Sequence, residues 1–230
     1  MSQPRQPLVI HHIEGRRSER VAWLCEELGL PYALSFTAGD VRGSLRALAQ
    51  THVMRMAPIL EDGPVKLVES GAILDYILLR YGEGRLRPPP DSPDMVDYLQ
   101  WTHFAEGSGM FRAMMERLVW QLAGDKPPGD VAFLYIGGSR RVLDFAEAAL
   151  DARLYFAGTS FSAADIMMHF PLRIAPLALQ GITAVTPLFH DDRSGLDGYP
   201  NVNAFLDRMA VRPAFRRAMA ATLPDGPPPI

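Results

Sequence analysis

One stretch, residues 57–77 (APILEDGPVKLVESGAILDYI), constrains the fold of this chain more than any other. Its two short apolar runs, 57–60 and 65–68, flank Asp62-Gly63, a dipeptide typical of tight hairpin turns. Directly after Glu69-Ser70, apolar residues recur at helical spacing. The stretch therefore predicts two antiparallel strands followed by a helix that begins at Glu69-Ser70.

Two residues of this stretch have both a structural and a ligand-binding interpretation. Pro58 cannot donate to a sheet, and its spacing alone favours a trans proline at a strand edge. The alternative is a cis Ala57–Pro58 bond, which turns the preceding backbone outward. Ser70 fits an ordinary helix N-cap, or a position where the helix N-terminus binds a ligand carboxylate.

The residues before this stretch predict an α/β unit. Runs 8–12 and 32–36 are expected strands, and a helix over about 19–28 lies between them. A strand–helix–strand path makes the two strands parallel. With a weaker helix within 39–50 and the hairpin, the result is a four-stranded mixed sheet. His11 and His12 point to opposite faces of the first strand, so no metal site is predicted.

The rest of the chain has helical periodicity. Segment 82–93 (GEGRLRPPPDSP) is rich in proline and glycine and is the predicted domain boundary. It separates an α/β domain, residues 1–83, from an all-helical domain, residues 94–230. Ser162 and Asp165 have capping-box spacing, which we assign to folding and not to catalysis. Helices are expected over about 94–122, 130–150, 166–172, 202–209 and 212–221.

Composition narrows the class of partner and the compartment. The 230 residues are 48% hydrophobic and 21% charged, which fits a globular protein with a sizeable core. A net charge of −3 argues against nucleic-acid or anionic-membrane partners. The single cysteine, Cys25, excludes an internal disulfide, and its place on an apolar helix stripe indicates a buried, inert thiol. Without a signal-peptide core or a membrane-spanning run, a cytoplasmic location is expected.

Pro58 and the run Glu69-Ser70-Gly71-Ala72-Ile73 resemble the glutathione-binding half of the glutathione transferase superfamily. The resemblance is closest to a microbial branch of small cytosolic glutathione transferases and covers nearly the whole chain. It continues through residues 23–32 (WLCEELGLPY), 81–86 (YGEGRL), 103–108 (HFAEGS) and 161–165 (FSAAD). The resemblance implies a thioredoxin-like α/β N-terminal domain with a cis-proline, an all-α C-terminal domain, glutathione as co-substrate, and a homodimer.

The resemblance also implies a set of glutathione-binding residues. Glu69 and Ser70 would hold the γ-glutamyl end, and the backbone of Ala57, beside Pro58, would pair with the cysteinyl part. The lysine usual before this proline is Met56 here, and Arg55 offers a replacement charge. No metal is implied.

Thiol activation is where the sequence departs from the family pattern. A thiol with a pKa of about 8.5 needs about 2.7 kcal/mol of thiolate stabilisation to lower the pKa by about two units. One or two hydrogen bonds to the sulfur supply this. Serine-using branches place serine four residues before the helix arginine, but here Arg16 stands four residues before Arg20. The catalytic candidates are therefore Ser18, by a hydrogen bond, and Arg16, by charge, or the loop backbone. The structural alternatives are a helix N-cap for Ser18 and a solvated charge for Arg16.

The second substrate is expected between the domains. Ile13, Met110, Phe111 and Met114 are candidate walls of an adaptable apolar pocket, with core packing as the alternative. The predicted reaction is attack of the glutathione thiolate on an apolar electrophilic small molecule, a detoxification chemistry. Two alternatives stay open. One is a non-catalytic protein that binds glutathione or hydrophobic ligands, and the other is a glutathione-dependent peroxidase, lyase or isomerase.

Overall fold

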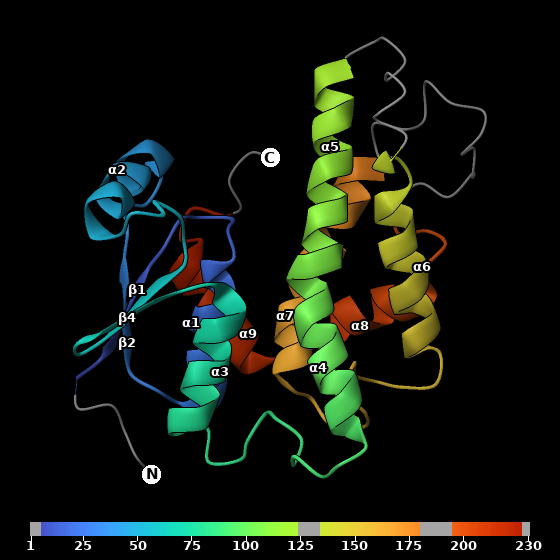
Figure 1. Cartoon of the computed structure of the whole chain (residues 1–230), viewed down its shortest axis with the longest axis horizontal. Coiled ribbons are helices and arrows are strands. Elements are labelled where there is room, and N and C mark those ends of the chain that lie inside the picture. Colours follow the sequence, from blue (N-terminus) through green and yellow to red (C-terminus); the bar gives the residue numbers. More distant parts are fainter. Residues whose placement is uncertain (1–5, 124–133, 180–194, 227–230) are drawn as a thin grey trace. The chain divides into compact units, whose positions relative to one another are not determined.

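The computed structural model of the chain describes residues 6–123, 134–179 and 195–226 and divides into two compact units (Figure 1). Unit 1 comprises residues 1–89 together with 209–230, and unit 2 comprises residues 90–208. The predicted division assigned 209–230 to the helical domain, whereas the contacts of this segment assign it to unit 1. Sequence periodicity could not reveal this, because a helical stripe does not say which surface it covers.

Unit 1 is built on a four-stranded mixed sheet, as predicted. Its order is β2-β1-β3-β4; β1 and β2 are parallel, and the other two pairs are antiparallel. Gly63, with φ of 57°, makes the turn between β3 and β4. The strands are β1 (Leu8–His11), β2 (Tyr32–Ser35), β3 (Ile59–Asp62) and β4 (Val65–Val68).

The helices of unit 1 are α1 (Ser18–Leu28), α2 (Val41–Thr51), α3 (Ser70–Tyr81) and α9 (Pro213–Thr222). The C-terminal helix α9 packs on α1, next to the sheet (Figure 1). The Trp23 and Phe215 rings lie 4.8 Å apart, centroid to centroid. Arg212 donates to both carboxylate oxygens of Glu27, at 2.7 and 2.9 Å. This two-point pairing fixes α9 on α1 more specifically than a single charge contact would.

Unit 2 contains α4 (Asp94–Phe104), the π-helix η1 (Ala105–Met110), α5 (Phe111–Ala123), α6 (Gly138–Leu150), α7 (Ala163–Leu179) and α8 (Pro200–Ala210). The predicted helix over 94–122 is therefore interrupted by a π-helical turn. Gly109 lies in that turn, where a Cβ would come within 3.1 Å of Pro171 in α7. Glycine thus suits the close approach of the two segments, because a side chain here would press on Pro171. Residues 130–133 of the predicted helix 130–150 lie outside the described residues.

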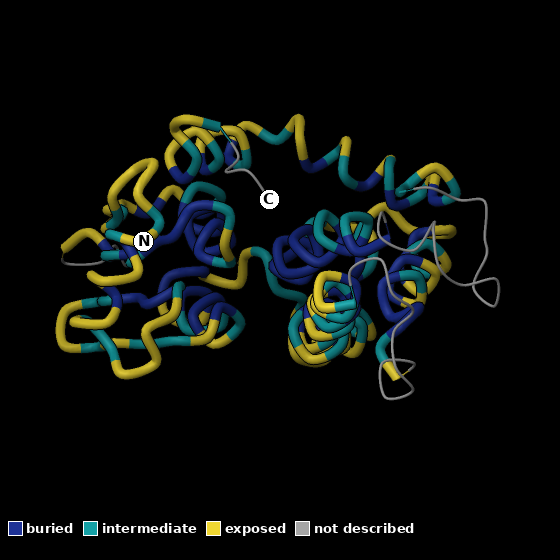
Figure 2. Tube along the Cα trace, turned by 90° about the horizontal axis from the view of Figure 1, so that it is seen from above, coloured by how far each residue is buried: buried dark blue, intermediate teal, exposed yellow. Residues whose placement is uncertain are grey.

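Aromatic rings form the core of unit 2. The buried Trp101 ring lies 4.7 Å from Phe156, and Phe156 lies 5.0 Å from Phe205. Phe145, which is 43% exposed, covers Trp101 from the outside at 4.6 Å. Figure 2 shows that the buried residues gather in the interior of each unit, with exposed residues on the outward sides of the helices. Among residues 6–123, 134–179 and 195–226, no helix is both long and apolar enough to cross a bilayer.

Three helices of unit 2 begin at a buried or half-buried carboxylate. Glu116 is fully buried in α5, and its two oxygens accept from the backbone N–H groups of Gly137 (2.6 Å) and Ser139 (2.7 Å) at the start of α6. At α7 the carboxylate is Asp165, which accepts from Ser162 and Phe156 (2.8 Å each), and at α8 it is Glu147, which accepts from Asn201 and Val202 (2.9 Å each). The structural role predicted for Ser162 and Asp165 is confirmed, because a carboxylate suits the unpaired N–H groups of a helix start.

Candidate active site

The turn between β1 and α1 carries Ser18, the predicted hydroxyl donor. Ser18 is the first residue of α1 and is fully buried. Its Oγ lies 2.7 Å from Nδ1 of His12 and accepts from the backbone N–H of Ile13 at 3.4 Å. The helix has no side-chain cap hydrogen bond, so the N-cap interpretation of Ser18 is wrong. The hydroxyl turns back toward the end of β1.

His12, which sequence reasoning did not place in the site, is the partner of this hydroxyl. The imidazole is fully buried, and its Nε2 lies 2.8 Å from the backbone carbonyl oxygen of Thr222 at the end of α9. The edge of the ring meets Phe36 at 4.7 Å. Burial lowers the pKa of His12 to about 4, against a smaller opposite effect of the hydrogen bond to Thr222. His12 is therefore neutral at neutral pH.

His11 points to the opposite face of the sheet, as predicted. Its Nε2 lies 3.2 Å from a carboxylate oxygen of Glu61 on β3. In the described parts of the chain, no three side chains of His, Cys, Asp or Glu are grouped as a metal site would need. The Cys25 thiol is fully buried in α1, and burial raises its pKa, which agrees with the inert thiol expected from the sequence.

Arg16, the other catalytic candidate, lies on the outside of the same turn. Its side chain is exposed, and Nη1 donates to the carbonyl oxygen of Gly15 at 3.0 Å. Gly15 has a φ of 67°, which suits the tight reversal between β1 and α1. The guanidinium is thus an accessible positive charge at the start of α1, in contrast to the buried Ser18 hydroxyl.

The start of α3 joins a buried polar pair to an exposed carboxylate. The Ser70 hydroxyl is buried and accepts from Nη1 of Arg20, which is itself buried in α1, at 3.0 Å. The N-cap position is held by Glu69 and has no side-chain cap hydrogen bond, so the N-cap interpretation of Ser70 is wrong. Glu69 is exposed and has a φ of 71°, a strained conformation for a residue with a side chain. Periodicity assigned Arg20 only to a helix and gave no sign of this pairing.

The segment before β3 is the second part of the site. The Ala57–Pro58 bond is cis, so the trans interpretation from spacing is wrong and the cis form implied by the resemblance is confirmed. Ala57 is half-buried, and within the described residues its backbone has no backbone hydrogen-bond partner. Arg55 and Met56 are exposed, and Arg55 has a φ of 52°.

Strand register brings these two segments together. Ile59 at the start of β3 pairs with Val68 at the end of β4, so residues 55–58 and 69–70 leave the hairpin at the same end. An open strand-like backbone therefore lies next to the N-terminus of α3. This arrangement can pair with an extended peptide backbone and offer a helix N-terminus to a carboxylate.

The four predicted acceptor residues differ in exposure. Ile13 is buried in unit 1, where it packs with Leu48 and Ile59. Met110 is buried in unit 2, which agrees with the core-packing alternative for these two residues. Phe111 and Met114, on α5, are 51% and 44% exposed and are available to a ligand.

Family models match both parts of the chain. Residues 11–85 match the glutathione S-transferase N-terminal domain, and residues 136–213 match the glutathione S-transferase C-terminal domain. Glutathione S-transferase 3 of Zea mays is 30% identical over 75% of this chain and 73% of its own length. Glutathione S-transferase 3 of Schizosaccharomyces pombe is 27% identical over 92% of this chain and 86% of its own length.

Solved structures agree on the fold. A glutathione S-transferase from Actinobacillus pleuropneumoniae superposes with a TM-score of 0.74 at 24% identity, covering 96% of this chain and 94% of that one. The transferase URE2P6 of Phanerochaete chrysosporium, in complex with oxidized glutathione, gives 0.73 at 18% identity, covering 95% and 97%. With a cis-proline before β3, a helix opened by Glu69-Ser70 and both family domains matched in order, the chain belongs to the glutathione transferase superfamily.

Proposed function

We propose that the protein is a glutathione transferase that binds glutathione in unit 1 and activates its thiol for attack on an electrophile. The observation that carries this proposal is the meeting of residues 55–58 and 69–70 at one end of the β3–β4 hairpin. One segment offers backbone groups, and the other offers a helix start with a strained, exposed Glu69. Strained residues of this kind persist where function requires them.

Each part of glutathione then has a partner of suitable chemistry. The backbone of Ala57, set by cis Pro58, pairs with the cysteinyl part as an added strand would. The γ-glutamyl end carries an ammonium and a carboxylate: Glu69 takes the ammonium, and the α3 start with Ser70 takes the carboxylate. Arg55 supplies positive charge for the glycyl carboxylate, and Met56 offers apolar contact in place of a charge.

The sulfur is placed near the start of α1, where the thiolate is stabilised. The exposed Arg16 guanidinium contributes charge, and the helix N-terminus contributes its dipole. Ser18 is the other candidate donor, and its hydroxyl would have to turn from His12 to reach the sulfur. A stabilisation of about 2.7 kcal/mol lowers the thiol pKa by about two units, so that the thiolate predominates at neutral pH.

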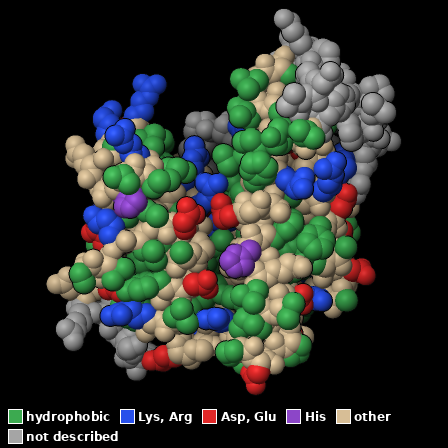
Figure 3. All heavy atoms as spheres, viewed as in Figure 1, with side chains coloured by type: hydrophobic (Ala, Val, Ile, Leu, Met, Phe, Trp, Pro, Cys, Tyr) green, Lys and Arg blue, Asp and Glu red, His purple; other side chains and the backbone are tan. Residues whose placement is uncertain are grey.

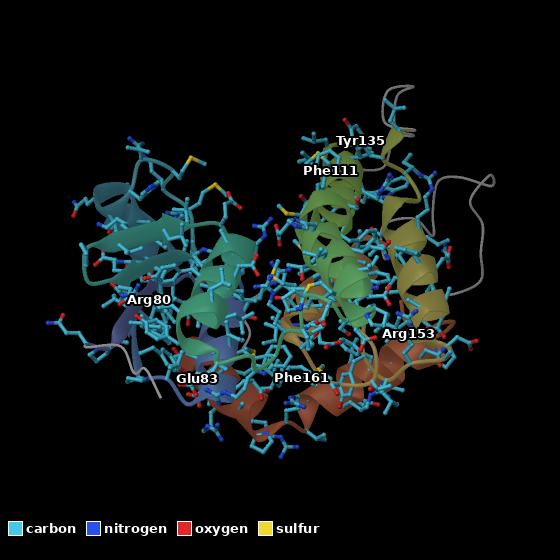
Figure 4. All side chains as sticks on the ribbon, turned by 60° about the horizontal axis from the view of Figure 1, so that its bottom comes forward. Arg80, Glu83, Phe111, Tyr135, Arg153 and Phe161 are labelled. Carbon is cyan, nitrogen blue, oxygen red and sulfur yellow. The ribbon has the colours of Figure 1, made fainter. Side chains whose placement is uncertain are left out.

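The acceptor side is proposed on α5. Figure 3 shows hydrophobic side chains gathered over this helix, and Phe111, Met114, Leu118 and Leu122 are its large exposed apolar residues. Phe111 lies beside Tyr135, with ring centroids 6.1 Å apart (Figure 4). Aromatic rings and methionines accommodate flat apolar electrophiles of varied shape. Met110, which directly precedes α5, is buried in the same unit.

Assembly and compartment follow the same proposal. We expect a homodimer, for which Leu79 on α3 (73% exposed) and Val96 on α4 (72% exposed) are available apolar contacts. A single, buried cysteine suits a reducing cytoplasm.

Calorimetric titration with glutathione, followed by ultraviolet absorbance of the bound thiolate, tests the proposal. Binding with thiolate absorbance at neutral pH, and turnover of 1-chloro-2,4-dinitrobenzene, are the expected results. The competing function is a glutathione-binding protein without turnover, which the buried Ser18 and the presence of Met56 favour. Binding without thiolate absorbance would identify that protein, and no binding at millimolar glutathione would refute both functions. A screen with peroxides, thioethers and isomerisable substrates separates a transferase from a peroxidase, lyase or isomerase.

A further inference from the structure

A continuous hydrogen-bonded chain runs through the interior of unit 1. It begins at the Ser18 hydroxyl, passes through both ring nitrogens of His12, and ends at the carbonyl oxygen of Thr222. All three residues are fully buried. The chain connects the turn that precedes α1 with the last turn of α9, more than 200 residues later.

The direction of each hydrogen bond follows from donor chemistry. A carbonyl oxygen only accepts, so Nε2 of His12 must carry the proton that is shared with Thr222. In the neutral ring, Nδ1 is then an acceptor, and the Ser18 hydroxyl must donate to it at 2.7 Å. The N–H of Ile13 donates to the same Ser18 oxygen. The Ile13 carbonyl oxygen is a second possible acceptor for the Ser18 hydroxyl but lies farther away, at 3.5 Å, so the single Ser18 proton is directed to His12.

We infer that His12 is a positioning residue of the transferase reaction: it holds the Ser18 proton, so that Ser18 fixes the turn over residues 13–17 and does not donate to the glutathione sulfur. The inference deepens the proposed function and rests on it for the reaction. Through Thr222, the position of this turn also depends on α9. The lowered pKa of His12 agrees with the neutral ring that the geometry requires.

The tautomer is the first test, and it needs no glutathione. In protein labelled with ¹⁵N-histidine, long-range proton–nitrogen spectra at pH 7 are expected to show His12 protonated at Nε2 only. Replacing the other five histidines in turn assigns the signal even if His12 variants do not fold. A ring protonated at Nδ1, or at both nitrogens, would overturn the inference, because Ser18 would then be free to donate elsewhere.

The second test separates a positioning role from a catalytic one. In Ser18→Ala and His12→Gln, the pKa of the bound glutathione thiol is expected to stay within about 0.3 of the wild-type value, while KM for glutathione rises about fivefold as the turn loosens. Gln at this position retains an amide donor for Thr222 and lacks the imidazole Nδ1 that accepts from Ser18. Ser18→Thr keeps the hydroxyl and should restore KM, and His103→Gln, at an exposed position on α4, is the matched control.

A rise of one or more in the bound thiol pKa of Ser18→Ala would make Ser18 the donor and refute the inference. An unchanged KM in both variants would show that the chain stabilises the fold without positioning the site. If wild-type protein binds no glutathione, the proposed function fails, and the tautomer measurement still decides whether the Ser18 proton belongs to His12.

Discussion

The helix starts in the candidate site differ from three helix starts in unit 2. In unit 2, α6, α7 and α8 each begin at a carboxylate of the protein itself: Glu116, Asp165 and Glu147. In unit 1, α2 likewise begins at a carboxylate, Asp40, whereas the N-cap residues of α1 and α3 make no side-chain cap hydrogen bond. Their first residues, Ser18 and Ser70, bond to other elements instead.

This difference separates structural helix ends from functional ones. A helix N-terminus attracts negative charge, and a carboxylate of the protein that occupies it leaves no room for a ligand. The helices of unit 2 use this attraction for stability. The start of α3 has no acidic residue in its first turn and belongs, with the start of α1, to the site that we propose for glutathione, a ligand with two carboxylates.

The largest expected effect is on the occupied helix starts. Glu116→Ala should lower the free energy of unfolding by about 3–5 kcal/mol, because it removes two charge-assisted hydrogen bonds and leaves two backbone donors unpaired. Urea unfolding measures this change. Glu116→Gln, which keeps the size and one acceptor oxygen, should lose about half as much. A loss below about 1 kcal/mol for Glu116→Ala would mean that the α6 start does not depend on this carboxylate.

Acid is expected to lower the free energy of unfolding by protonating His12 in unit 1. The pKa of His12 is about 4 in the folded protein and about 6.5 when unfolded, so between these values the unfolded state binds more protons. The free energy of unfolding therefore falls as the pH drops from about 6.5 toward 4, by about 3 kcal/mol from this residue. Denaturation at pH 7 and pH 4.5 measures the loss. His12→Gln does not titrate and should lack this component; equal losses in both proteins would contradict the assignment.

The start of α3 predicts an effect on binding in addition to an effect on stability, because Ser70→Ala also removes an acceptor of the buried Arg20. Ser70→Ala should weaken glutathione binding about tenfold, because a hydroxyl is lost beside the ligand carboxylate. Ser162→Ala, at the capped start of α7, is the matched control. It should lower the free energy of unfolding by about 1 kcal/mol and leave glutathione affinity unchanged. Calorimetry measures the glutathione affinity of both variants, and urea unfolding measures their stability. A larger loss of affinity in Ser162→Ala than in Ser70→Ala would contradict the comparison.

The smallest expected effect concerns the exposed segment before the cis-proline. Met56→Lys should tighten glutathione binding by about twofold to fivefold at low salt, since an exposed charge pair contributes less than about 1 kcal/mol. The gain should shrink at high salt because the charges are screened. Met54→Lys, at an equally exposed methionine two residues earlier, should change the affinity less. Equal gains would indicate general charge attraction.

The fold was predictable from sequence where local patterns decide it. The Asp62-Gly63 turn, the parallel β1–β2 pair and the Ser162–Asp165 box depend on neighbouring residues and agree with the structure. The π-helical turn at 105–110 was not predictable, because the apolar spacing of this segment fits an uninterrupted α-helix. The place of α9 in unit 1 depends likewise on distant partners such as Glu27.

The candidate site was predictable only in part. The family resemblance pointed to Pro58, Glu69 and Ser70. It did not predict the contacts and backbone conformation of these residues in the structure. Arg20 and His12 were missed because each is defined by a partner 50 or more residues away, Ser70 in one case and Thr222 in the other. A buried polar residue gives no local pattern when its partner lies on another element.

Residues 209–230 belong to unit 1, although all of unit 2 separates them in the sequence from the rest of unit 1. This separation affects the order in which the two units are completed during synthesis. A ribosome makes the sheet and α1 first, yet the carbonyl that His12 requires emerges 210 residues after His12. Unit 2 can fold while unit 1 still lacks α9, although domains usually fold from the N-terminus onward. A nascent chain stalled before residue 209 is therefore expected to carry an incomplete site, which is completed only after α9 has been made.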